Sequence, residues 1–80
     1  MTKQDYKLAV KNTARQIIAL VEIRKSLQKV IDSLNPENFQ SQESFQNFLQ
    51  NETKKVQSID TNLNRLISNV RFYHKLSLTL

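Results

Sequence analysis

Residues 35–44, NPENFQSQES, decide the fold because they interrupt an otherwise unbroken helical pattern. Pro36 is the only proline of this 80-residue chain, which has no glycine. The residue before a proline is pushed out of the α region, so Asn35-Pro36 ends any helix that precedes it. Asn35 is suited to cap the next turn, with Pro36 and Glu37 in its first positions. Ser41 is a second N-cap candidate, for a helix that begins at about residue 42.

The segment before this loop, residues 3–34, shows heptad spacing. Arg24 and Thr13 occupy the two sites where the apolar series is interrupted. Spacings of three and four residues predict an amphipathic helix whose apolar stripe packs against a second helix. The apolar members of the series are Tyr6, Val10, Ile17, Leu20, Leu27, Ile31 and Leu34.

The segment after the loop repeats the pattern, with Glu52 filling one site of the series. Two such segments around one short break predict an all-α fold: an antiparallel two-helix hairpin with helices at about 3–34 and 42–76. The whole chain, 1–80, then forms one domain. A three-helix bundle with a break near Asn51 is the alternative. The apolar members are Phe45, Leu49, Val56, Ile59, Leu63, Leu66, Val70 and Tyr73.

Folding the chain about the middle of the loop predicts a register between the two stripes. In this register apolar residues face apolar residues, and the two charged interruptions, Arg24 and Glu52, lie opposite each other. A buried pair of opposite charges fixes register in helical assemblies, because a slip leaves each charge against apolar side chains. We therefore interpret Arg24 and Glu52 as a register pair and not as a catalytic site.

Apolar residues are left over outside this seam, on both of its flanks. A helix that is apolar on both flanks expects more than one neighbour, and a single seam in so short a chain supplies little burial. We expect two hairpins to pair into a four-helix bundle as a homodimer, or one hairpin to dock on a different protein. The predicted partner-binding residues are Ile18, Val21, Ile23, Val30, Phe48, Ile67, Phe72 and Leu76.

The composition offers few of the groups that chemistry needs. Without glycine there is no phosphate-binding glycine loop, and without cysteine there is no disulfide framework. The single histidine, His74, has Asp5 as the only acid expected nearby, and no nucleophile is paired with it. The sequence therefore predicts a protein that is not an enzyme and that takes no cofactor, metal or small-molecule substrate.

Twelve Lys and Arg against seven Asp and Glu give a net charge of +5. The hairpin gathers seven cations at the end that holds both termini, where Asp5 alone opposes them, for a side-chain charge of +6. Residues 26–52, nearest the turn, carry one cation and four carboxylates, a charge of −3. The basic end is either a solvated surface or a phosphate-binding site. This basic patch is Lys3, Lys7, Lys11, Arg15, Arg65, Arg71 and Lys75.

No apolar run approaches the length of a membrane span, and the N-terminal residues lack the pattern of a secretory signal, so we expect a cytoplasmic protein. The function that the sequence favours is protein binding through the apolar surface outside the seam, as in adaptors, inhibitors, immunity proteins and secretion chaperones. The alternative is a nucleic-acid-binding regulator that grips phosphates with the basic end.

Overall fold

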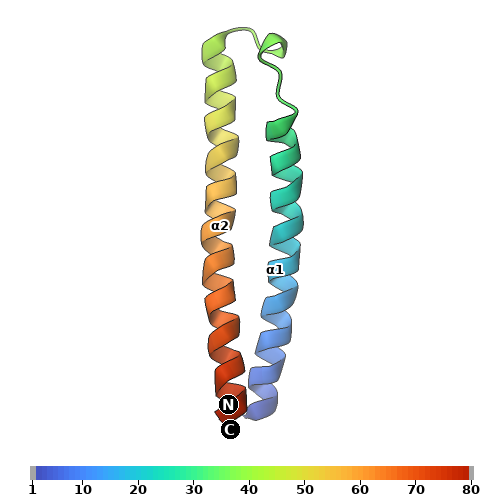
Figure 1. Ribbon diagram of the computed structural model, residues 1–80, viewed down its shortest axis with the longest axis vertical. Helices are drawn as coiled ribbons and strands as arrows, with labels where there is room; N and C mark the ends of the chain where they lie inside the picture. Colours follow the sequence, from blue (N-terminus) through green and yellow to red (C-terminus); the bar gives the residue numbers. More distant parts are fainter. Residues whose placement is uncertain (1, 80) are drawn as a thin grey trace.

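The computed structural model describes residues 2–79 and confirms the all-α helical hairpin (Figure 1). Helix α1 spans Lys3–Asp32, the short 3₁₀ helix η1 spans Pro36–Asn38, and helix α2 spans Gln42–Thr79. The two long helices run antiparallel, with both chain ends together at the end remote from the turn (Figure 1). Helix α2 passes through Asn51 without a break, so the three-helix alternative is wrong.

A side chain caps the N-terminus of each helix, and the caps at Asn35 and Ser41 are the predicted ones. Ser41 accepts a hydrogen bond from the Ser44 N–H (3.1 Å) at the start of α2, and Asn35 accepts one from the Glu37 N–H (3.0 Å) in η1. At the start of α1, Thr2 and Asp5 form a reciprocal capping box. The Asp5 carboxylate accepts bonds from the backbone N–H and the hydroxyl of Thr2, which lower the pKa of this carboxyl below its ordinary value.

The connection between the helices packs on α2. It rises past the last turn of α1 before it joins the first turn of α2 (Figure 1). The ring of Phe39 lies 5.3 Å from that of Phe45 and 5.6 Å from that of Phe48, measured between centroids. The first turns of α2 are thus covered by the connection, and α1 packs against the turns that follow.

This connection shifts the register, and the predicted pairing of Arg24 with Glu52 is wrong. Arg24 binds Asp60 instead, eight positions further along α2, with its Nε 2.6 Å from Asp60 Oδ1. Glu52 does lie in the seam, only 6% exposed, but its ion-pair partner is Lys55 on its own helix, at 2.9 Å. The prediction failed because it folded the chain about the midpoint of the loop, whereas Phe39 ties the loop to one helix.

The core is thin, because two helices share only one line of contact. Among residues 2–79 the only apolar residues classed as buried are Val56 and Leu66, and no large side chain is fully enclosed. Thr13 and Ser77 are also buried in the seam, and the Ser77 hydroxyl donates to the His74 carbonyl oxygen at 2.7 Å. The hairpin is correspondingly elongated, with principal extents of 59 × 15 × 14 Å.

The buried carboxylate of Glu52 generates a stability prediction. Glu52→Leu is expected to raise the free energy of unfolding by about 1 kcal/mol, because an apolar side chain replaces a desolvated charge held by one partner. Glu22→Leu is the matched control: Glu22 also pairs with a lysine three residues on, but it is exposed. Urea titrations of both variants followed by circular dichroism measure the effect. An equal gain in both variants, or a loss in Glu52→Leu, would contradict the burial argument.

The Arg24–Asp60 pair generates a pH prediction. The hydrogen bond from the Arg24 guanidinium lowers the pKa of Asp60 below its ordinary value of 3.8. Because the folded-state pKa is the lower one, the stabilisation is fully present above pH 3.8 and is lost as pH falls through the folded-state value. The melting-temperature difference between the natural chain and Asp60→Asn should therefore be largest near neutral pH and shrink as the pH is lowered below 3.8. Glu22→Gln serves as the control, and a difference that persists in acid would refute the pairing.

Candidate interaction surfaces

The seam divides the surface of the hairpin into two flanks. With Val10 and Leu49 at heptad position a, and Tyr6 and Phe45 at position d, positions e and b lie on one side of the seam and positions g and c on the other. In an antiparallel pair the same heptad positions of both helices fall on the same side. The groove described below agrees with this rule, since Lys7 and His74, both at position e, line it together.

The low-charge flank is the g and c side, and it carries four of the eight large apolar residues that are exposed between residues 2 and 79, against three on the other flank. On this flank Ile23, Val30, Phe48 and Phe72 are exposed, and Leu76 is half-buried. Its only charged residues within the two long helices are Asp5, Lys55 and Arg65. The remaining positions of this flank hold small or uncharged polar residues. They are Ala9, Asn12, Gln16, Ala19, Ser26, Ser44, Asn51, Ser58, Asn62, Asn69 and Thr79.

The charged flank is the e and b side. It carries Ile18, Ile67 and Leu78 as exposed apolar residues, and Val21 is half-buried. They stand among many more ionisable side chains than the low-charge flank holds. Those side chains are Lys7, Lys11, Lys25, Asp32, Glu43, Asp60, Arg71 and His74. The two flanks therefore differ in their number of charged residues, although both consist of heptad positions outside the seam.

Of the eight apolar residues predicted for partner binding, six are exposed, and Val21 and Leu76 are half-buried. The structure does not bring the eight into one patch, because the seam separates them into the two flanks. Two further exposed leucines escaped the prediction, Leu8 and Leu78. Their spacing from Val10 and Tyr73 places both off the seam, which is the signal that could have found them.

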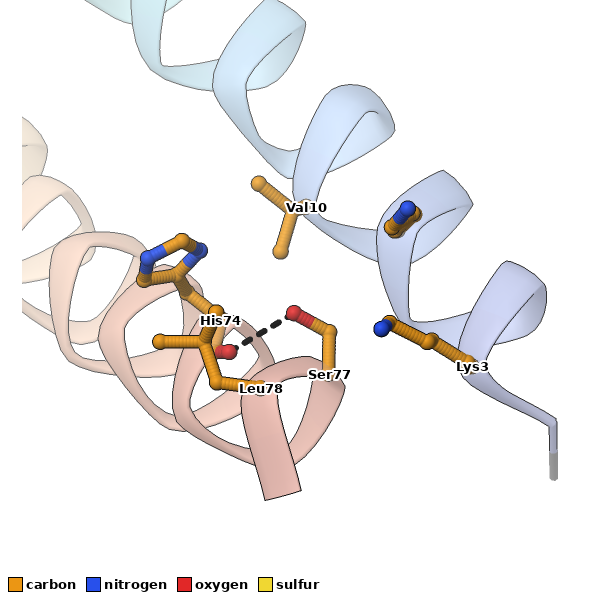
Figure 2. A pocket seen from close by; sticks show the side chains of 6 residues that line it. Lys3, Val10, His74, Ser77 and Leu78 are labelled. Carbon is orange, nitrogen blue, oxygen red and sulfur yellow. Dashed lines mark hydrogen bonds between the residues drawn. The ribbon is translucent and has the colours of Figure 1, made fainter. Parts of the chain in front are cut away.

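A shallow groove of about 350 Å³ opens on the charged flank, at the end that holds both termini (Figure 2). Val10 and Leu78 supply its apolar lining, while Lys3 and Lys7 of α1 and the imidazole of His74 from α2 lie around it. The Ser77 hydroxyl is committed to the His74 carbonyl oxygen. Such a groove suits an anionic group attached to an apolar one.

The seven residues of the basic patch all lie in the half of the hairpin that holds the chain ends (Figure 1), but they surround that end: Lys7, Lys11 and Arg71 are on the charged flank and Arg65 is on the low-charge flank. All seven of its side chains belong to exposed residues. The ion pairs formed between described residues involve Arg24, Lys25 and Lys55, and none of the seven. The side chains of the basic patch are therefore solvated and accessible to an anionic partner.

Within residues 2–79, no cluster of three or more His, Cys, Asp or Glu side chains is arranged to hold a metal ion. Over the same range, neither long helix has the length and apolar character needed to cross a bilayer.

No protein-family model, no curated protein and no solved structure matches this chain significantly.

Proposed function

We propose that this chain is a non-enzymatic protein-interaction module, which binds another polypeptide or a second copy of itself through apolar helix surface outside the hairpin seam. The observation that carries the proposal is the low-charge flank. On this flank Ile23 is 50% exposed and Phe72 is 59% exposed, and neither side chain faces the seam between the two helices. Large exposed apolar side chains on a face with few charges are typical of interaction sites.

The surface area of the isolated hairpin supports the same proposal. It exposes 6111 Å², whereas a compact monomer of this size exposes about 5,000 Å². The radius of gyration is 18.2 Å, against about 12 Å for a compact domain of 80 residues. The hairpin alone therefore leaves roughly 1,000 Å² more in water than a self-sufficient fold would.

The biological roles that fit are those in which a small helical protein covers, blocks or escorts another one: adaptor, inhibitor, immunity protein or secretion chaperone. A cytoplasmic location is part of this proposal, and it is compatible with a chain that has no cysteine and so needs no oxidising compartment.

The proposal predicts that the monomer is only marginally stable. At sub-micromolar concentration, where light scattering reports a monomer, thermal unfolding followed by circular dichroism should be broad and centred below about 45 °C, the lower edge for mesophilic domains. The midpoint should rise with protein concentration or with addition of a binding partner, because association stabilises the folded state by mass action. A monomer that melts sharply above about 60 °C at every concentration would refute the proposal.

A second candidate function is supported by the basic patch and the groove. Six net positive charges at one end of a slender molecule suit the phosphates of a nucleic acid, and Lys3, Lys7 and His74 converge there around one concavity. Tyr6 is the only aromatic residue between Lys3 and Arg15, and single-stranded nucleic acids are bound largely by stacking on aromatic side chains. This candidate function therefore favours a duplex or a structured RNA as the ligand.

This candidate predicts salt-sensitive binding that depends on the position of the cations. If about four phosphates are contacted, affinity for a labelled duplex should fall roughly a hundredfold between 50 and 200 mM salt, as measured by fluorescence anisotropy. Neutralising three patch residues should abolish binding, whereas neutralising three lysines elsewhere should not. The test variant is Lys7→Gln, Lys11→Gln, Arg15→Gln, and the matched control is Lys25→Gln, Lys29→Gln, Lys54→Gln. Equal loss in both variants, or binding that ignores salt, would remove the candidate.

A further inference from the structure

We infer that the low-charge flank is covered by the low-charge flank of a second copy of this chain, with the two hairpins antiparallel, so that the turn of each lies beside the chain ends of the other. The result is a four-helix bundle with one two-fold axis across the middle of the helices. The inference rests on the proposed function, and it names both the partner and the geometry.

The choice of flank follows from the charges. Burying a charge without a partner is expensive, so an interface core selects the side of the hairpin with the fewest charges. The low-charge flank has three charged residues along its whole length: Asp5 near one end, and Lys55 and Arg65 nearer the middle, of which Lys55 is paired with Glu52 on its own helix. The charged flank would bury Asp60, already held by Arg24, together with several lysines. It stays in water in the arrangement inferred here.

The choice of a second copy follows from the area. The hairpin is a rod of 59 × 15 × 14 Å, so one of its long sides offers roughly 900 Å², close to the 800 Å² that each partner of a standard interface buries. This area also matches the surplus of roughly 1,000 Å² that the lone hairpin exposes. Two identical hairpins packed side against side therefore cover the surplus of both copies at once.

The antiparallel orientation follows from the spacing of the large residues on α2. Phe48 lies in the turn half and Phe72 with Leu76 in the other half, and the level midway between them is at residues 60–62. That level is also the middle of α2, which spans Gln42–Thr79. A two-fold axis at that level aligns α2 of one copy with α2 of the other along their full lengths. It also brings Phe48 of each copy to the level of Phe72 and Leu76 in the partner.

Charge favours the same orientation. Each hairpin carries +6 in side chains at the end with the termini and −3 in the turn half. The antiparallel pair sets each basic end beside an acidic turn, whereas a parallel pair would stack the two basic ends and the two acidic turns. The helices are far longer than the ~10 Å screening length at 0.1 M salt, so both ends contribute separately.

The first experiment maps the flank with two isoleucines of the same helix. Ile23→Asn, on the low-charge flank, should weaken dimerisation about tenfold or more in sedimentation equilibrium, because it puts a polar amide in the apolar interface. Ile18→Asn, on the charged flank, should leave the dimer intact although Ile18 is the more exposed, at 64%. Circular dichroism checks helicity, and Phe72→Asn provides a second test if Ile23→Asn does not fold. Equal effects at Ile18 and Ile23 would overturn the assignment of the flank.

The second experiment measures orientation in the intact dimer. The chain has no cysteine, so Asn47→Cys and Thr61→Cys, both at outward heptad positions, can each carry one spin label. At 1.5 Å rise per residue, the antiparallel pair separates the two labels at position 47 by at least about 40 Å along the axis, while labels at position 61 lie near the same level. A parallel pair gives similar distances at the two sites.

A long distance at position 47 with a short one at position 61 supports the inference. Similar distances at both sites would overturn the antiparallel arrangement while leaving the chain an interaction module. A monomer at all concentrations would overturn the second copy as the occupant of this flank. In that case the melting behaviour of the monomer decides separately whether the proposed function survives.

Discussion

A pair of helices has one line of contact, and the rest of this structure depends on that limit. Each helix can bury only the stripe that faces its neighbour, so even seam residues are mostly half-buried, and Val56 and Leu66 stand out as buried apolar residues. Any apolar side chain that the sequence places off the seam is then necessarily in water. The exposed flanks are thus a direct consequence of building one seam from residues that could fill more than one.

The heptad pattern was sufficient to predict the fold but not the register. Apolar spacing, Pro36 and the caps at Asn35 and Ser41 are local signals, and each of them is realised in the helix bounds. Register is a property of the connection, whose path depends on where Phe39 packs. The sequence alone does not specify which side chains Phe39 packs against.

The surfaces show the same division between local and non-local information. Counting positions from the seam identifies which apolar residues are left exposed, as at Ile18 and Ile23. Which of these residues share a flank depends on the heptad position of each and on the antiparallel direction of the helices. The ion pair of Arg24 with Asp60 was missed for a related reason: Asp60 lies beside the seam and not in it, so no apolar series marks it.

Because the charged flank and the low-charge flank lie on opposite sides of the hairpin, the two candidate functions, protein binding and nucleic-acid binding, would use different surfaces. In an antiparallel four-helix bundle the low-charge flanks face inward and the charged flanks form the two outer faces. Apart from Arg65 on the low-charge flank, each basic end then remains solvated, and the two ends lie at opposite extremes of a body about as long as one hairpin, 59 Å. In the proposed arrangement dimerisation would leave the groove around Lys3 and His74 open and present it twice. Two weak anion sites at a fixed separation would bind an extended polyanion more tightly than either site alone, because the second contact is intramolecular.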